Sequence, residues 1–305
     1  MNYKYINTNT KVDNVEQIDK FYQELVSNAS YSDLIINKQS FVDDTVSLND
    51  LTFRSHDGAN IYAKYVYPKN MPITKVLLLF HGYHVASGAW FDKIAMAKFG
   101  IAVLAMDSRG HSGKSVDIVQ TAGSTMKGLI IKGIHEGHQN LYMPKLYMDT
   151  YIMSLIAKDL HPDCKLICSG ESLGGALALA CASLSNNVDL CITQYPYLCD
   201  IKEAYNMGKG YAGLEDYFRW EDPTLETYNN IFDQLSYIDL KNMVHNVNAP
   251  VTMFVGNKDQ VCPPQCMFSM YNKLTVPKNH FIYHEYGHEY LQGAEDKKLE
   301  LILSL

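Results

Sequence analysis

The chain has 305 residues and a formal net charge of −7, from 26 Lys and Arg against 33 Asp and Glu. Hydrophobic residues make up 47% of it and aromatic residues 11%, which is enough for a large buried core and excludes an intrinsically disordered chain. The acidic balance argues against nucleic acid as a partner, because phosphate binding needs a basic face.

The first fifty residues are polar, and we expect an N-terminal extension (about 1–50) with one helix near Val15 to Ser27. Ile18, Phe21, Tyr22 and Leu25 would share one face of that helix. The chain start lacks a basic stretch followed by an apolar run, so we predict no signal peptide. The longest apolar runs are too short to cross a bilayer, so we expect no membrane partner.

Strand patterns then dominate. Two strand-like runs, Leu51–Arg54 and Ile61–Tyr67, flank an Asp57-Gly58 turn signal and predict a hairpin. Short apolar runs follow at Val76–Phe80, Ile101–Met106, Leu166–Ser169, Leu190–Thr193, Val251–Val255 and Phe281–Tyr283. Helical stretches separate them, notably Leu146–Leu160 and Gly174–Leu184. Apolar strands that alternate with helices predict an α/β fold, a mostly parallel sheet covered by helices on both faces.

The segment from Tyr195 to Asn248 breaks this alternation, because it is rich in tyrosine and acidic residues. We interpret it as a helical insertion over the carboxyl edge of the sheet, where the sites of α/β proteins form. No linker demands a second domain, so residues 1–305 are expected to form a single domain.

The seven cysteines are an odd number, and several lie inside apolar runs. Those in the apolar runs, Cys168, Cys181 and Cys191, are most simply buried free thiols of a reducing cytoplasm, which predicts a cytoplasmic location. Cys262 and Cys266 lie four residues apart around Pro263-Pro264. Loop packing is the favoured interpretation of this pair, with a disulfide or a metal site as the alternative.

The most informative stretch is Gly170-Glu171-Ser172-Leu173-Gly174, between a strand-like run and a helix-like run. G-x-S-x-G alone is a weak motif, but this context is that of a nucleophile turn. The turn would expose the Ser172 hydroxyl at a helix N-terminus, where backbone N–H groups stabilise negative charge.

A serine hydroxyl needs a base, and the base needs an orienting acid, which α/β-hydrolases supply in the order Ser, Asp or Glu, His. Asp259 follows the predicted strand Val251–Val255, and His288 follows Phe281–Tyr283. Both should therefore face the same sheet edge as Ser172. His81 and His111 are rival bases, but both precede the serine and suit supporting roles better.

The oxyanion hole should use two backbone N–H groups. One is that of Leu173, directly after the nucleophile, and the other that of Tyr83, in the loop after Val76–Phe80. Gly82 would let this loop approach the reacting carbonyl closely. A simple strand-end turn is the alternative for this loop.

The stretch His284-Glu285-Tyr286-Gly287-His288 matches the zinc protease motif H-E-x-x-H. That motif needs a helix to place both histidines on one face, together with a third ligand. This stretch contains a glycine and continues a predicted strand, so we expect neither a metal nor another cofactor.

From about residue 15 to 295, the chain resembles the acetyl xylan esterase/cephalosporin C deacetylase family of carbohydrate esterases, on the α/β-hydrolase fold. The segments that carry the resemblance are Phe80-His81-Gly82-Tyr83, Met106 to His111, Asp259 to Pro264, His288-Glu289, Pro196 to Cys199 and Leu235 to Asp239. Two positions depart from the family pattern, since Leu173 and His111 stand where the family usually has glutamine.

The resemblance implies removal of acetyl groups from small acetylated sugars or related short-chain esters, without a cofactor. It implies that Ser172 attacks, His288 transfers protons and Asp259 orients His288, and that the chain forms a homo-oligomer, a hexamer. The alternatives are an α/β-hydrolase acting on another ester or a peptide, a catalytically silent hydrolase-fold binding protein, and a zinc hydrolase.

Overall fold

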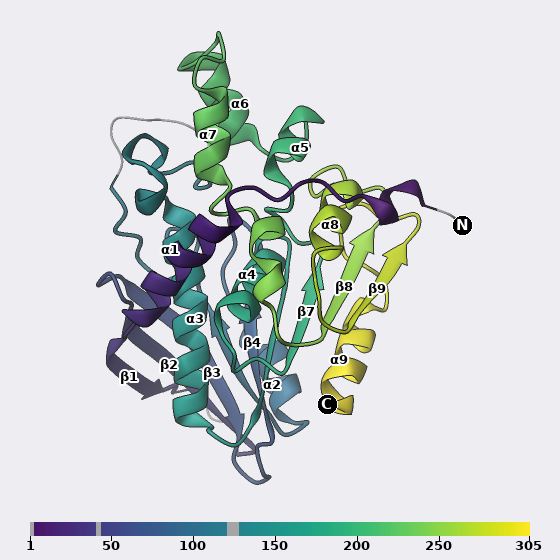
Figure 1. Ribbon diagram of the computed structural model, residues 1–305. Helices are drawn as coiled ribbons and strands as arrows, with labels where there is room; N and C mark the ends of the chain where they lie inside the picture. Colours follow the sequence, from purple (N-terminus) through teal and green to yellow (C-terminus); the bar gives the residue numbers. More distant parts are fainter. Residues whose placement is uncertain (1–2, 41–43, 121–127) are drawn as a thin grey trace.

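A computed structural model describes residues 3–40, 44–120 and 128–305. Within them, one nine-stranded sheet runs through the molecule in the order β1-β2-β3-β5-β4-β6-β7-β8-β9 (Figure 1). The strands are β1 (Ser32–Lys38), β2 (Val46–Arg54), β3 (Asn60–Pro68), β4 (Lys75–Phe80), β5 (Ile101–Met106), β6 (Lys165–Glu171), β7 (Leu190–Gln194), β8 (Val251–Gly256) and β9 (Lys278–Tyr283).

The helices are α1 (Val15–Ser27), α2 (Trp90–Ala97), α3 (Tyr142–Leu160), α4 (Leu173–Leu184), α5 (Ile201–Asn206), α6 (Ala212–Trp220), α7 (Tyr228–Leu235), α8 (Pro264–Tyr271) and α9 (Ala294–Ser304). None of the helices in the described residues is both long and apolar enough to span a bilayer.

Strands β4 to β9 pair in parallel, and β1, β2 and β3 add an antiparallel edge beside β5. Every residue of β5 and of β8 is buried, as expected for parallel strands covered on both faces. Helices α3 and α4 pack against each other in front of the sheet, and α2 lies behind it in Figure 1. The predicted α/β architecture is therefore confirmed.

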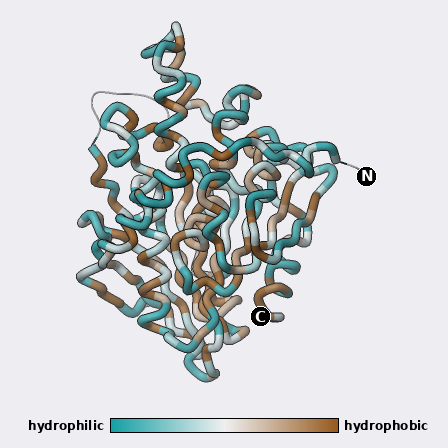
Figure 2. The backbone as a smooth tube through the Cα atoms, in the orientation of Figure 1, coloured by the Kyte–Doolittle hydropathy of each residue, from teal (hydrophilic) through white to brown (hydrophobic). Residues whose placement is uncertain are grey.

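The apolar residues concentrate where the strands cross the centre of the molecule (Figure 2). Helix α4 consists almost entirely of small and apolar residues, and ten of its residues are buried against the sheet and α3. All seven cysteines are free and buried, which was predicted for Cys168, Cys181 and Cys191. The core thus holds α4 rigidly, together with the turn that precedes it.

The N-terminal region follows the prediction in one element and departs from it in another. Helix α1 spans Val15–Ser27 as expected, and its Ile18 and Tyr22 are buried. Strand β1 was not expected. It is an edge strand with mostly exposed residues, so its sequence, Ser-Asp-Leu-Ile-Ile-Asn-Lys, lacks the alternating pattern of a half-buried strand.

Between β7 and β8 the chain forms α5, α6 and α7 and two short 3₁₀ turns. Helices α6 and α7 project beyond the ends of the parallel strands in Figure 1. Asp239 connects the two ends of this segment, because its carboxylate accepts the N–H groups of Asp200 and Ile201 at 2.9 and 2.7 Å. The segment between β7 and β8 is thus mostly helical.

Candidate active site

Ser172 lies at the turn between β6 and α4, directly after the last strand residue and before the first helix residue. Its backbone has φ 54° and ψ −119°, a conformation that a side chain other than glycine's rarely adopts. Neighbouring strands hold this turn. The Ser172 N–H donates to the Gln194 carbonyl at 3.0 Å, and the Tyr197 N–H donates to the Ser172 carbonyl at 3.0 Å.

The two glycines of the motif are required by close backbone contacts. A Cβ added at Gly174 would lie 2.0 Å from the Phe80 carbonyl oxygen, and one at Gly170 would lie 2.3 Å from the Gly174 carbonyl oxygen. Both distances are far inside van der Waals contact. The glycines therefore allow the start of α4 to pack directly on the end of β4, whose following loop carries Tyr83.

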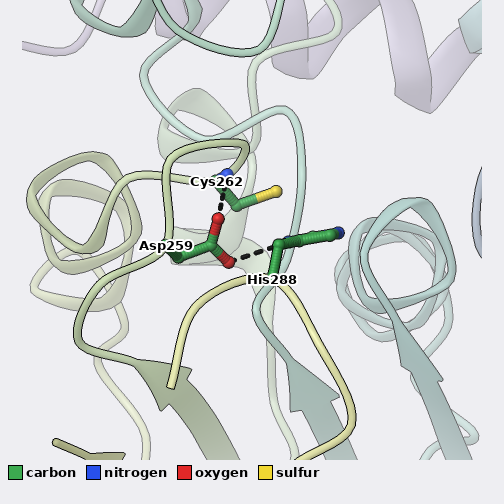
Figure 3. Close-up of side chains that lie close together, drawn as sticks. All are labelled: Asp259, Cys262 and His288. Carbon is green, nitrogen blue, oxygen red and sulfur yellow. Dashed lines mark hydrogen bonds and ion pairs between the residues drawn. The ribbon is translucent and has the colours of Figure 1, made fainter. Parts of the chain in front are cut away.

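The structure brings Ser172, His288 and Asp259 into one hydrogen-bonded chain. His288 Nε2 lies 3.0 Å from Ser172 Oγ, and His288 Nδ1 lies 2.8 Å from Asp259 Oδ2. Asp259 is 2% exposed, and its Oδ1 accepts the N–H groups of Val261 and Cys262 at 2.8 and 2.7 Å. Figure 3 shows the carboxylate held between the Cys262 backbone and the His288 ring.

The loops that carry the acid and the histidine meet through their backbones. A Cβ at Gly256 would lie 2.2 Å from the Gly287 carbonyl oxygen, so only glycine fits at the end of β8. The Lys258 N–H donates to the Tyr286 carbonyl at 2.8 Å. These contacts set the spacing of Asp259 and His288.

The two amides predicted for the oxyanion hole flank the serine turn. Among the described residues, neither the Tyr83 N–H nor the Leu173 N–H donates to another protein group. The Leu173 side chain is fully buried, so that residue offers only its backbone to a substrate. The Tyr83 ring is fixed because its hydroxyl accepts the Leu129 N–H.

Gly82 lies against the serine turn without a tight contact to it, and its predicted closeness to a substrate carbonyl stays a prediction. A Cβ at this position would make only ordinary contacts, the closest at 3.8 Å from the Glu171 carbonyl oxygen. The loop therefore approaches the serine turn without needing a glycine at this point, and the essential close contact is at Gly174.

His81 is the first residue of the oxyanion loop, directly after β4. Its Nε2 accepts the Ser108 N–H at 2.8 Å, so its proton is on Nδ1, which donates to the Gly82 carbonyl at 2.8 Å. Burial lowers the pKa of His81, which favours this neutral form. Both ring nitrogens are thus engaged in support of the loop, away from Ser172.

His111 packs edge-on against the Tyr83 ring, with centroids 4.9 Å apart. Its Nδ1 lies 3.1 Å from the Arg109 carbonyl oxygen, and its Nε2 is buried without a hydrogen bond to the described residues. Burial lowers the pKa of His111 to about 4, so the ring is neutral at pH 7. Among the described residues, His288 hydrogen-bonds to the serine and neither of the two rival histidines does.

The segment Met106 to His111, which carries part of the family resemblance, is anchored by a buried ion pair. Arg109 is fully buried and binds both carboxylate oxygens of Asp149 at 2.6 Å, while its Nη1 binds Asp57 at 2.5 Å. A bidentate pair of this kind holds the Arg109 side chain in one geometry and thereby fixes the backbone of the segment Met106 to His111. Because the next residue upstream, Ser108, bonds to His81, the ion pair supports the oxyanion loop.

Cys262 is a neighbour of this group that the sequence did not single out for the site. Its burial raises the pKa of the thiol well above the usual value, the charge of Asp259 adds to this, and a hydrogen bond with Ser172 opposes it. The thiol is therefore protonated at neutral pH and is no rival nucleophile. The only sign of this in the sequence was its place in the segment Asp259 to Pro264, which carries part of the family resemblance.

A metal ion would find donors here, since the ligand atoms of Asp259, Cys262 and His288 lie within 4.8 Å of one another. These donors are already used, because Asp259 binds two amides and His288, and the thiol is protonated. The H-E-x-x-H stretch forms a loop after β9, and its His284 faces Tyr3 instead. The residues do not fit a zinc protease site.

A cavity of about 530 Å³ opens beside Ser172. Its walls are largely apolar and come from the oxyanion loop, the segment after residue 128 and the start of α6. They include Tyr83, Ile131, Tyr197, Tyr211, Leu214 and Val261. A volume of this size holds a small ligand next to the nucleophile.

Comparison with known proteins agrees with this geometry. The sequence model of the family described as acetyl xylan esterase (AXE1) matches residues 3–304. The crystal structure of acetyl xylan esterase 1 from Thermoanaerobacterium sp. JW/SL YS485 is similar, with a TM-score of 0.94 and 33% identity over 100% of this chain and 98% of that one. An acetyl xylan esterase from Paenibacillus sp. R4 has a TM-score of 0.93 and 26% identity, over 99% and 98% of the two chains.

Acetyl esterase Axe7A from Xylanibacter ruminicola is 28% identical over 200 residues, which cover 61% of this chain. The match spans only 42% of that longer relative. A cold-adapted esterase from an Arctic intertidal metagenomic library, at 14% identity and a TM-score of 0.62, shares the fold.

Proposed function

Because the chain belongs to the acetyl xylan esterase family, on the α/β-hydrolase fold, we propose that it is a serine esterase that removes acetyl groups from small acetylated sugars. The observation that carries the proposal is the hydrogen-bonded chain from Ser172 through His288 to Asp259. This arrangement is what nucleophilic acyl transfer requires: a nucleophile, a base within reach, and an acid that orients the base.

In the first half of the reaction, Ser172 Oγ attacks the ester carbonyl while His288 Nε2 accepts its proton. Asp259 keeps the other ring nitrogen protonated and stabilises the imidazolium that forms. The N–H groups of Tyr83 and Leu173 stabilise the tetrahedral oxyanion, together with the N-terminal end of α4. His288 then donates its proton to the leaving alcohol, which leaves an acetyl-enzyme.

In the second half, water enters and His288 takes its proton, so that hydroxide attacks the acetyl carbonyl. The same two amides stabilise the second oxyanion. The collapse of this intermediate releases acetate and returns the proton to Ser172. No cofactor takes part in the cycle.

The cavity beside Ser172 has room for the part of the substrate beyond the acetyl group. It is far larger than an acetyl group, so we propose that its apolar wall receives the alcohol portion of the ester. Leu173 replaces the glutamine usual in the family, and its buried side chain offers no polar group to a sugar hydroxyl. A cephalosporin C deacetylase activity belongs to the same proposal, since it too removes an acetyl group.

We also propose a cellular location and an assembly for the protein. Seven buried free thiols suit a reducing cytoplasm. A homo-oligomer, a hexamer by family resemblance, would cover exposed apolar side chains such as Phe91 and Trp220, which are 76% and 73% exposed.

The acyl specificity tests this function. We expect acetate release from acetylated xylose, and a kcat/KM for p-nitrophenyl acetate at least about tenfold above that for p-nitrophenyl octanoate, the discrimination expected of a pocket closed around a short acyl group. Steady-state rates with purified protein over a series of acyl lengths provide the measurement.

Three results would contradict it. Equal or faster octanoate hydrolysis would assign the cavity to the acyl chain and make the protein a longer-acyl esterase. No hydrolysis of any ester would favour a silent binding protein, while inhibition by EDTA would revive a metal-dependent reaction.

A further inference from the structure

Glu171, the residue before the nucleophile, is held by two donors from the neighbouring strand. Its Oε2 accepts the Tyr195 hydroxyl at 3.1 Å and lies 3.3 Å from Gln194 Nε2. Glu171 and Gln194 are register partners in the parallel pair of β6 and β7. A carboxylate is therefore tied down at the strand end that presents Ser172.

Tyr195 connects this carboxylate to the catalytic histidine. Its ring packs on His288, with centroids 4.5 Å apart and planes at 50°. Tyr195 is 5% exposed and has φ 32°, an uncommon backbone conformation for an aromatic residue, and its N–H donates to the Phe254 carbonyl at 2.7 Å. Strain that the surroundings hold in place is typical of functional positions.

The chemistry of this contact favours a charged His288. The face of a phenol ring attracts a cation, and a hydrogen bond from the phenol to a carboxylate makes the ring more electron-rich. Burial, and then the charge of Glu171, raise the pKa of Tyr195, so the hydroxyl stays protonated and remains a donor. Glu171 is itself exposed at the end of β6, so it brings a charged group to the Tyr195 hydroxyl from outside the core.

We propose that Tyr195, tethered to Glu171, is a positioning residue that holds the His288 ring between Ser172 and Asp259 and stabilises its imidazolium form. The proposal rests on the proposed esterase function. It adds a second negative group, that of Glu171, to the acid of the triad.

Other groups around His288 must be considered in any pH effect. The titratable neighbours are Asp259 and Cys262 on the loop after β8, Ser172 and Glu171 at the end of β6, Tyr195 after β7, and Glu289 on the histidine's own loop. Glu171→Gln changes only one of these and keeps its size and an acceptor oxygen.

The test is the pH profile of kcat/KM for p-nitrophenyl acetate, whose acid limb reports the protonation of the free enzyme's base. In Glu171→Gln the limb should move to lower pH by about 0.5 units, because a negative charge near the imidazolium is lost. Tyr195→Leu should lower kcat/KM about tenfold, the scale of a desolvated cation–π contact, with less than about a twofold change in KM.

Tyr195→Phe separates the ring from the hydroxyl. It should keep most of the rate and move the limb in the same direction as Glu171→Gln but by less, because the hydrogen bond is lost while the Glu171 charge stays. The double variant should shift by less than the sum of the two single shifts, because the two residues share that hydrogen bond. The matched control is Tyr228→Phe, which removes a hydroxyl that donates to Asn206 at 2.8 Å on the helical segment. Its profile should equal that of the wild type.

An unmoved acid limb in Glu171→Gln and Tyr195→Phe would overturn the proposal, even if Tyr195→Leu failed to fold. A Tyr195→Leu enzyme with the wild-type rate would overturn it as well. If Ser172→Ala is inactive, either of these results overturns only the role of Tyr195 and leaves the esterase function intact. If Ser172→Ala is active, the esterase function and the role of Tyr195 both lose their basis.

Discussion

Replacement of Ser172 by alanine is expected to lower kcat/KM for p-nitrophenyl acetate by about 10⁴-fold or more, since loss of a triad nucleophile leaves only the oxyanion hole and binding. The Ser172 hydroxyl oxygen lies 3.0 Å from His288 Nε2. The neighbouring Cys262 thiol is protonated and cannot act as a nucleophile in its place. Initial rates at substrate concentrations below KM provide the measurement.

The matched control is Ser183→Ala on the same helix, whose hydroxyl donates to the Leu179 carbonyl at 2.8 Å. It should keep the wild-type rate. Both variants should melt within about 3 °C of the wild type, because neither removes a buried apolar group. A Ser172→Ala enzyme with most of its activity would show that the nucleophile lies elsewhere.

Replacement of Gly174 by alanine should disrupt the fold around the site. The added Cβ would lie 2.0 Å from the Phe80 carbonyl oxygen and 2.9 Å from the His81 carbonyl oxygen, both of which are backbone atoms. Helix α4 must then move away from β4, at a cost of about 3 kcal/mol or more. We expect a melting temperature lower by about 10 °C or insoluble protein, and loss of the oxyanion hole.

Gly82→Ala, in the loop after β4, is the control for this effect, because its Cβ would lie 3.8 Å from its nearest neighbour, the Glu171 carbonyl oxygen. Its melting temperature should stay within about 3 °C of the wild type. If Gly174→Ala were as stable as Gly82→Ala, the close packing of α4 on β4 would be wrong.

The arrangement of the site could be anticipated because chain order and strand ends carry it. Parallel strands present their carboxyl ends at one edge, so residues that follow β6, β8 and β9 had to meet there. Ser172, Asp259 and His288 each follow one of these strands, and the structure places them in hydrogen-bond contact.

What the sequence did not indicate depends on contacts across the fold. The approach of Gly256 to Gly287 joins two loops whose spacing no local pattern describes. The tether from Tyr195 to Glu171 joins residues 24 apart in the chain, and its meaning appears only when the His288 ring lies beside them. Strand β1 escaped prediction because an exposed edge strand needs no apolar face.

Active-site labelling tests the esterase account most directly. A fluorophosphonate reacts only with a serine that a base activates, and it mimics the tetrahedral intermediate beside an oxyanion hole. The intact protein should gain one adduct per chain, peptide mapping should place it on Ser172, and acetate release should fall in proportion. Fully active protein without an adduct, or an adduct that persists in Ser172→Ala, would contradict the account.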